Sequence, residues 1–309
     1  MNKKSKIFIA GHNGLVGSAI TKIAKKNGFE NILTISRSKL DLTNQKKVFE
    51  YLKKNKPDGI IIAAAKVGGI HANNIKRAEF IYENLSIQNN IIHGSYLAGI
   101  KNLIFLGSSC IYPKKSKMPI KEEYLLSGKL EDTNEPYAIA KIAGLKLCES
   151  YNYQYKTNYK CLMPCNIYGA NDNYDLKTSH FFPALISKIH TAKLKNLDHI
   201  TLWGDGRPKR ELLHSDDLAR ACLFFLGKNV SQSLINIGSG TEMTIKEYAE
   251  FIIKKLNSKI QIHFDKSKPN GTMRKLIDSS FAKKQGWTPK ISIDDGFKLA
   301  YEDFLDQIN

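Results

Sequence analysis

Tyr137 and Lys141 stand four positions apart and carry the first recognisable acid–base pattern of the chain. In a helix this spacing places the phenol and the ammonium on the same face. A free tyrosine has a pKa of about 10, which is too high for acid–base work near neutral pH. A neighbouring ammonium and the positive charge of an oxidised nicotinamide favour the phenolate and lower that pKa. We therefore expect Tyr137 to give a proton to a carbonyl oxygen as hydride arrives at the carbon, or to remove it in reverse.

Ser108 and Ser109 follow an apolar run at 103–107, where a strand is expected to end. A hydroxyl at this place could polarise the carbonyl group that Tyr137 protonates. The spacing Tyr-x3-Lys alone is common by chance. A serine at a strand end, a later Tyr-x3-Lys and a glycine-rich opening together form a specific combination.

The glycine-rich opening consists of Gly11, Gly14 and Gly17, between an apolar run at 7–10 and an amphipathic stretch at 15–26. Glycines at such a turn let the backbone approach a pyrophosphate, which then sits on the helix amino terminus. A tight strand-to-helix turn also favours glycine. The position of the motif between a predicted strand and a predicted helix favours dinucleotide binding.

Ser36 and Arg37 lie at the end of the second predicted strand, about 20 residues beyond the glycines. An Asp or Glu there would bind the ribose hydroxyls of NAD. An arginine suits the 2′-phosphate of NADP instead, because a guanidinium forms paired hydrogen bonds with phosphate. The sequence therefore favours NADP(H), with a plain surface arginine as the structural alternative.

Apolar runs alternate with amphipathic stretches over the first half of the chain. Short, near-continuous apolar runs separated by helices indicate a parallel sheet covered on both faces. The predicted fold is therefore α/β, a Rossmann-like doubly wound parallel sheet with a smaller, discontinuous α/β substrate-binding domain. We assign 1–166 and about 212–240 to the dinucleotide domain, and about 167–211 and 241–309 to the second domain. The predicted strands are 7–10, 32–35, 59–65, 103–107, 159–163 and 234–237, and the predicted helices are 15–26, 45–54, 78–98, 137–155 and 244–256.

The 309 residues carry a formal net charge of +18, but their basic residues are mostly scattered lysines that predict solvated surface. Neither a nucleic-acid-binding motif nor an apolar run long enough for a membrane span is visible. Five cysteines without a Cys-x-x-Cys pair predict no disulfide framework and no metal site, and fit a reducing cytoplasm. Arginine, the residue type best suited to binding phosphate, is scarce. The arginines are Arg37, Arg77, Arg207, Arg210, Arg220 and Arg274.

Longer segments show that the chain resembles the extended short-chain dehydrogenase/reductase family almost end to end. Within that family it is similar to the epimerase/reductases that act on GDP-4-keto-6-deoxy sugars. The segments that carry the resemblance are GHNGLVG (11–17), AAAKVGG (63–69), LGSSCIYP (106–113), NEPYAIAKIAG (134–144), PCNIYG (164–169), SH (179–180), WG (203–204), RELLH (210–214) and SKPNGTMRK (267–275).

The resemblance implies NADPH-dependent conversion of GDP-4-keto-6-deoxy-D-mannose to GDP-L-fucose, by epimerisation at C3 and C5 followed by reduction at C4. The reductase roles carry over onto Ser108, Tyr137 and Lys141. The roles of base and acid in epimerisation carry over onto Cys110 and His180, whose side chains titrate near neutral pH. Without the resemblance, Cys110 would be interpreted as a small buried residue and His180 as a loop histidine without a role.

The resemblance also implies which residues bind the two nucleotides, and it implies a homodimer paired through 78–98 and 137–155. The residues expected to bind the cofactor are Gly11, His12, Asn13, Gly14, Leu15, Val16, Gly17, Arg37, Asp41, Leu42, Ala64, Leu106, Gly107, Ser108, Ser109, Tyr137, Lys141, Pro164, Cys165, Asn166, Ile167 and His180. The residues expected to bind the GDP-sugar are Lys188, Trp203, Arg210, Asn270 and Lys275.

Two positions depart from the pattern, since relatives commonly have Arg in place of Asn13 and Asp in place of Asn270. The first departure weakens the preference for NADP, and the second loosens guanine recognition or assigns it to another residue. Three alternatives stay open. The substrate could be another GDP-4-keto-deoxy sugar, of a colitose or 6-deoxy-heptose pathway, the chain could bind NADP without catalysis, or it could be a basic nucleic-acid binder on the same fold.

Overall fold

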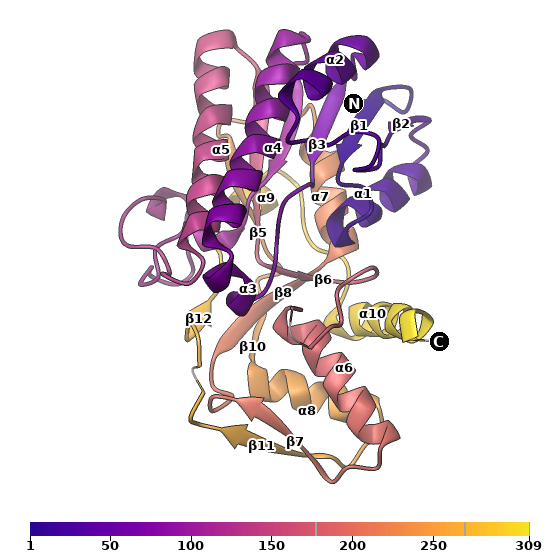
Figure 1. Cartoon of the computed structure of the whole chain (residues 1–309), viewed down its shortest axis with the longest axis vertical. Coiled ribbons are helices and arrows are strands. Elements are labelled where there is room, and N and C mark those ends of the chain that lie inside the picture. Colours follow the sequence, from indigo (N-terminus) through magenta and orange to yellow (C-terminus); the bar gives the residue numbers. More distant parts are fainter. Residues whose placement is uncertain (177, 269, 309) are drawn as a thin grey trace.

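The computed structural model describes residues 1–176, 178–268 and 270–308 (Figure 1). Pro269, which belongs to the SKPNGTMRK segment, lies outside the described residues. The chain forms two parts that lie one above the other in Figure 1, a sheet flanked by helices and a smaller group of strands and helices.

The larger part is built on a parallel sheet, which in the described residues has the strand order β2-β1-β3-β4-β5-β9. Neighbouring strands run parallel throughout. Its central strands are almost entirely buried, as continuous apolar runs require in a sheet covered on both faces. This arrangement confirms the predicted doubly wound fold. The strands are β1 Lys6–Ala10, β2 Asn31–Leu33, β3 Gly59–Ile62, β4 Asn102–Leu106, β5 Asn158–Pro164 and β9 Leu234–Ile237.

Helices cover both faces of this sheet (Figure 1). On one face α4 packs against α2 and α5, and on the other α1 packs against α7. The connections after β4 and β3 contain short helical turns. These elements are α1 Leu15–Lys26, α2 Gln45–Asn55, α3 Ile70–Ile75, α4 Arg77–Leu97, η1 Ser109–Ile111, η2 Glu122–Tyr124, α5 Glu135–Tyr155 and α7 Ser215–Phe225.

The strand β3 is shorter than the apolar run at 59–65 predicts. It ends at Ile62, and Ala63 and Ala64 are only half buried because the chain leaves the sheet there and passes the glycine turn. A Cβ atom on Gly11 would lie 2.6 Å from the backbone nitrogen of Ala64. The strand β2 likewise ends at Leu33 rather than at residue 35.

The smaller part contains the strands that pair around β8. The strand β8 pairs with β6 and β12 in parallel and with β10 in antiparallel orientation, while β7 pairs with β11. The strands are β6 Asn166–Tyr168, β7 His199–Trp203, β8 Lys209–His214, β10 Glu242–Thr244, β11 Gln261–Asp265 and β12 Arg274–Lys275. The remaining helices are α6 Phe181–Leu194, α8 Ile245–Lys255, α9 Ser280–Lys284 and α10 Ile293–Ile308.

Two hydrophobic cores lie in the two parts. One surrounds the six-stranded sheet and also includes Ile277, Ala282 and Trp287 from the carboxy-terminal segment. The other includes Phe182, Tyr248 and Phe297 from three helices of the smaller part. The predicted domain boundaries stay predictions, and these three residues of the first core fall within the range 241–309 that the sequence assigns to the second domain.

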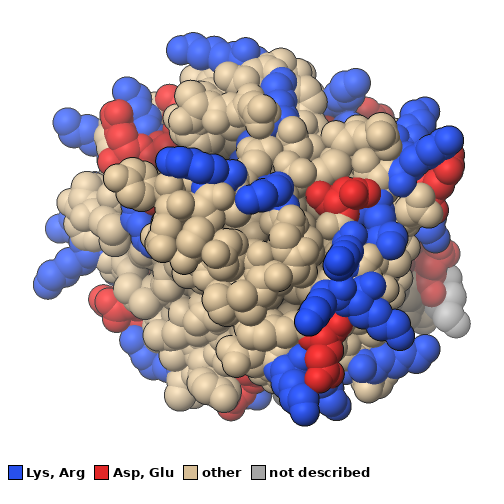
Figure 2. Space-filling model, turned by 90° about the horizontal axis from the view of Figure 1, so that it is seen from above, with Lys and Arg blue, Asp and Glu red and all other residues tan. Residues whose placement is uncertain are grey.

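The surface carries its positive charge without one dominant patch in the view that Figure 2 shows. Lysine and arginine side chains lie at many separate places around this face, several of them beside Asp or Glu. All five cysteines are free and buried. None of the helices in the described ranges combines the length and apolarity needed to cross a membrane.

Candidate active site

The turn between β1 and α1 brings backbone atoms closer together than any side chain would permit. Gly11 has a φ of +88°, and a Cβ atom on Gly17 would lie 2.0 Å from the carbonyl oxygen of Gly11. Helix α1 begins without a side-chain cap, and its first turn contains no acidic residue. Its amino terminus therefore keeps the partial positive charge that attracts a phosphate. The residues present fit a dinucleotide cofactor.

Arg37 lies beyond β2 with a largely solvent-exposed side chain. Its guanidinium is 3.8 Å from the carboxylate of Glu83, a loose ion pair between side chains on the surface. Hydrogen bonds from the backbone and hydroxyl of Thr43 lower the pKa of Asp41, and the charge of Arg37 lowers it further. Arg37 and Asp41 are thus neighbours, and the guanidinium is accessible to a phosphate group.

The other residues expected to bind the cofactor lie along one edge of the sheet. Ala64 follows β3, Gly107 and Ser109 follow β4, and Pro164 ends β5 just before Asn166 begins β6. These positions share an edge because the carboxyl ends of parallel strands coincide. His12, Leu15, Val16, Leu42 and Ile167 are half buried, Cys165 is buried, and Asn13 is exposed.

The candidate reductase residues meet where β4 ends and α5 begins. Lys141 is buried, and its Nζ donates a hydrogen bond of 2.8 Å to the carbonyl oxygen of Leu106. The same Nζ is 5.6 Å from the centre of the Tyr137 ring. Ser108, two residues beyond Leu106, accepts a hydrogen bond of 3.3 Å from the backbone nitrogen of Cys110 through its Oγ. Lys141 therefore ties the helix that carries Tyr137 to the strand end that carries Ser108.

The pKa of Tyr137 departs in the direction opposite to the prediction. Burial raises the pKa of the phenol, and the neighbouring thiol of Cys110 adds to the increase. Burial also lowers the pKa of Lys141 to about 8. Desolvation outweighs the attraction of the Lys141 ammonium, which a backbone carbonyl already binds, so Lys141 alone does not lower the pKa of Tyr137. Tyr137 is therefore a neutral phenol at neutral pH, which is the form that donates a proton.

Cys110 is buried within reach of several positive charges. Burial raises the pKa of its thiol, while Lys275, a hydrogen bond with Ser108, and Lys141 act in the opposite direction. The pKa of Lys275 is lowered by burial first, and further by the nearby Arg210. Cys110 thus lies between the residues expected to reduce the substrate and those expected to bind its phosphates.

His180 immediately precedes α6 as its N-cap residue. Its side chain is exposed, yet the surrounding protein atoms desolvate it and lower its pKa. Among the described residues no hydrogen bond joins His180 to Cys110. The turn before it is held to the larger part of the molecule, since Gly69 donates a backbone hydrogen bond of 3.3 Å to Thr178.

That turn connects to the reductase residues through a short series of contacts. A Cβ atom on Gly68 would lie 3.3 Å from the Phe80 ring. The Phe80 ring packs edge-on against Tyr137 at a centroid distance of 6.4 Å. Phe80 is a site-neighbouring residue that the sequence analysis missed, since a phenylalanine in an amphipathic helix carries no signal beyond core packing.

Two cations form the centre of the predicted substrate region. Arg210 and Lys275 are register partners in the adjacent strands β8 and β12. Burial lowers the pKa of both side chains. The Nη1 of Arg210 donates to the carbonyl oxygen of Thr272 at 2.6 Å, which leaves other guanidinium N–H groups available. Two partly desolvated cations side by side favour an anionic ligand such as a diphosphate.

Three further predicted residues lie at or next to β7. Asn270 accepts a hydrogen bond of 2.8 Å from the backbone nitrogen of Asp205. Trp203 ends β7 with a side chain that is 67% exposed. Lys188 donates to the carbonyl oxygen of Thr201 at 2.8 Å, so its ammonium already has a backbone partner.

Glu211 is a buried carboxylate that the sequence analysis did not single out. It is fully buried and accepts hydrogen bonds from the backbone nitrogens of Gly240, at 2.7 Å, and Ile277, at 3.0 Å. It therefore fixes the segment after β12 against β8, and with it the Arg210–Lys275 pair. The signal in the sequence that could have pointed to Glu211 was its charge next to the apolar residues of the RELLH segment.

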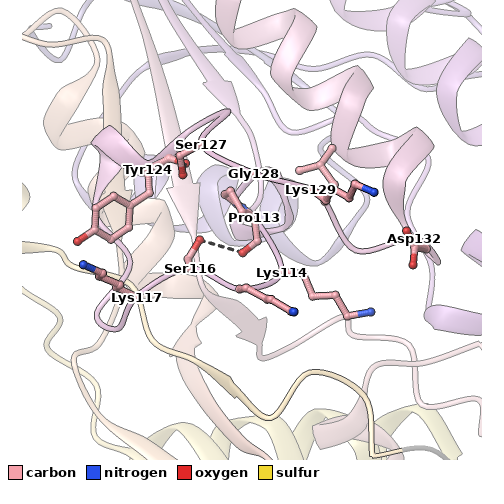
Figure 3. Close-up of a pocket in the computed structure, with 11 residues that line it drawn as sticks. Pro113, Lys114, Ser116, Lys117, Tyr124, Ser127, Gly128, Lys129 and Asp132 are labelled. Atoms are coloured by element: carbon pink, nitrogen blue, oxygen red, sulfur yellow. Dashed lines mark hydrogen bonds between the residues drawn. The ribbon is translucent and has the colours of Figure 1, made fainter.

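Figure 3 shows a separate hollow of about 610 Å³ in the connection between Cys110 and Tyr137. Its lining includes Lys114, Lys115, Lys117 and Lys129. None of the predicted site residues lines it, and Lys114 is paired with Glu131 at 2.9 Å. This hollow is therefore separate from the predicted site residues. The described residues contain no cluster of His, Cys, Asp and Glu suited to a metal ion.

The chain combines a doubly wound sheet, a dinucleotide-binding turn and a second part that offers cations across from it. This combination defines a nucleotide-dependent enzyme that acts on an anionic substrate. The chain belongs to the NAD dependent epimerase/dehydratase family, whose model matches residues 7–238. This finding confirms the resemblance inferred from the sequence.

Individual proteins resemble the chain over its whole length. It is 50% identical to a putative GDP-L-fucose synthase 2 of Arabidopsis thaliana, over all of this chain and 94% of the relative. It is 45% identical to the GDP-L-fucose synthase of Escherichia coli K12, over 98% of this chain and 97% of the relative. A solved GDP-mannoheptose C4 reductase from Campylobacter jejuni, with NADP bound, matches with a TM-score of 0.90 and 38% identity, over 99% of each chain.

Proposed function

We propose that this chain converts GDP-4-keto-6-deoxy-D-mannose to GDP-L-fucose, by epimerisation at C3 and C5 and reduction at C4. The observation that carries the proposal is the position of the Cys110 thiol beside the Tyr137–Lys141 pair. A thiol for proton exchange at carbon thereby lies beside the residues proposed to carry out reduction. The GDP-L-fucose synthases that match the full chain support this substrate.

NADPH is the proposed cofactor, and when bound it supplies the hydride for C4. The close-packed turn at Gly11 and Gly17 and the uncapped start of α1 suit its pyrophosphate. Arg37 is the proposed partner of its 2′-phosphate. The NADP-bound reductase that matches 99% of this chain supports the same choice.

Reduction requires a proton for the C4 oxygen. Tyr137 donates it, because burial keeps the phenol protonated at neutral pH. Ser108 donates a hydrogen bond to the same oxygen and polarises the carbonyl group. Lys141 positions Tyr137 through its bond to Leu106 and contributes a positive charge close to the forming oxyanion.

Epimerisation precedes reduction, because the C4 ketone is what acidifies the hydrogens at C3 and C5. At each carbon the Cys110 thiolate removes the proton and protonated His180 returns one on the opposite face. Before the next carbon, the Cys110 thiol gives a proton to solvent and the neutral His180 imidazole takes one from solvent. Burial alone disfavours the thiolate, so the nearby ammonium groups of Lys275 and Lys141 are needed to stabilise it. The GDP diphosphate binds Arg210 and Lys275, which places the sugar next to Cys110.

The deciding experiment is incubation with the keto sugar and NADPH in D₂O, with the product identified by NMR. We expect GDP-L-fucose with deuterium at both C3 and C5. A reduced product without deuterium at either carbon would sink the epimerase assignment. It would favour the second candidate, a C4 reductase of another GDP-keto sugar, which the similarity to the heptose reductase supports.

We further propose that the enzyme is a cytoplasmic homodimer paired through α4 and α5. Exposed apolar side chains on these helices support the pairing, among them Tyr82, Leu97 and Ile139. Free cysteine thiols fit a reducing compartment. Light scattering of the purified protein decides the oligomeric state, and a monomeric mass at micromolar concentration would contradict the dimer.

A further inference from the structure

Arg207 is one of the six arginines, and neither the proposed reaction nor the diphosphate site uses it. It lies in the turn between β7 and β8, and its side chain is 75% exposed. Its guanidinium is held by Asp205, whose carboxylate accepts from Nε and from Nη2, both at 2.6 Å. The same carboxylate accepts from the Arg207 backbone nitrogen at 3.1 Å. Three of the five guanidinium N–H groups are left for another partner.

The acceptors around this turn are already occupied. Asn270 accepts from the backbone nitrogen of Asp205 at 2.8 Å. Arg207 and the Asn270 side chain, through their hydrogen bonds, hold the pKa of Asp205 at about 2. A carboxylate has about four acceptor positions, and these partners use them. Asp205 therefore has no free acceptor for the N–H groups of a base, and Asn270 already accepts one bond through Oδ1, whereas Arg207 has free donors.

The turn lies between an exposed aromatic ring and a cation. Trp203 precedes Asp205 by two residues and is 67% exposed, with the Lys268 ammonium 5.9 Å from the centre of its ring. On the other side, Nη2 of Arg210 lies 3.5 Å from the position of a Cβ atom on Gly271, next to Asn270. A nucleoside diphosphate fits this order, with its base near Trp203 and its phosphates near Arg210. This step rests on the proposed function.

We propose that Arg207 recognises the purine of the substrate by donating to its O6 and N7 atoms. Paired arginine hydrogen bonds to these two atoms are the commonest specific contact with guanine. Asp205 is then a positioning residue that orients the guanidinium. Hypoxanthine has the same O6 and N7 but lacks the 2-amino group of guanine, so the site accepts both bases. Adenine presents a 6-amino donor in place of O6 and is rejected.

Calorimetric titration of the full-length protein with GDP, IDP and ADP tests this proposal. We expect IDP to bind within about threefold of GDP and ADP at least about tenfold more weakly, the scale of one lost hydrogen bond and one opposed donor. In Arg207→Ala, GDP and IDP should weaken about tenfold while ADP changes little. Arg207→Lys keeps the charge but not the paired geometry, so it should not restore the preference for GDP over ADP.

Arg274→Ala is the matched control, because Arg274 is held by Glu242 as Arg207 is held by Asp205, with Nε at 2.7 Å from the carboxylate. It should leave the GDP:ADP ratio unchanged. If the wild-type protein prefers GDP over IDP by tenfold or more, the 2-amino group of guanine is recognised by another residue. That result would overturn the proposal that Arg207 by itself recognises the base. If the protein binds NADPH but not GDP, the proposed function fails together with this inference. If a variant no longer binds NADPH, the relative affinities of the wild-type protein for GDP, IDP and ADP still decide whether the proposal holds.

Discussion

The two proposed nucleotide sites, a cofactor end at the turn before α1 and a substrate end in the smaller part, use different parts of the chain. At the cofactor end, the turn at Gly11 and Gly17 and the start of α1 present backbone groups from one continuous segment. At the substrate end, side chains of Trp203, Arg210 and Lys275 come from three separate strands. Backbone sites depend on local conformation and tolerate little added volume. Side-chain sites depend on how distant segments pack, and can change specificity by single substitutions.

Tyr137→Phe should produce the largest effect, because it removes the proton donor of the proposed reduction. We expect the rate of C4 reduction to fall about 10²- to 10⁴-fold, the usual contribution of a general acid. Deuterium exchange at C3 and C5 should continue, since Cys110 and His180 are unchanged. NADPH oxidation and NMR exchange measure the two activities separately. Equal loss of both would show that Tyr137 also takes part in epimerisation.

Arg210→Ala tests the substrate end by itself. Loss of charge-assisted hydrogen bonds should weaken GDP binding about tenfold to a hundredfold, while the Kd of NADPH stays the same. Lys209→Ala is the control, because this neighbouring cation is exposed and its side chain alternates to the other face of β8. Parallel loss of NADPH affinity in Arg210→Ala would mean that the two ends are not independent.

Gly17→Ala tests the backbone nature of the cofactor end. The added methyl group would lie 2.0 Å from the Gly11 carbonyl oxygen, so the turn must shift. We expect a loss of about 1–3 kcal/mol in the free energy of unfolding, measured by denaturant titration without cofactor. Gly14→Ala is the matched control, because the nearest atom to its Cβ position is 3.8 Å away. Equal stability of the two variants would refute the close packing of the turn.

Arg37→Ser should have the smallest effect, since its guanidinium is exposed and screened by salt. We expect the preference for NADPH over NADH to decrease about tenfold at low ionic strength, and less at high. Lys39→Ser removes the same charge from the same turn and should leave the preference unchanged. The ratio of kcat/KM for the two cofactors is the measurement, and an unchanged ratio in Arg37→Ser would assign the 2′-phosphate to another residue.

The sequence alone determined those features that follow from local pattern. The apolar runs predict the buried strands of the sheet, the glycines predict the turn into α1, and the spacing of Tyr137 and Lys141 predicts their shared helix face. Each of these features depends on residues that are close together in the sequence. The resemblance of longer segments added the roles of Cys110 and His180, which no local pattern indicates.

Only the tertiary structure decided what surrounds these residues. Burial raises the pKa of Tyr137 although Lys141 is close, because desolvation depends on atoms from the whole cleft. Arg210 and Lys275 are 65 positions apart in sequence and become neighbours only through the pairing of β8 with β12. The same is true of Asn270, which contacts Asp205 and leaves Arg207 as the free donor. Such contacts join segments without sequence periodicity, so their chemistry is set by packing and not by composition.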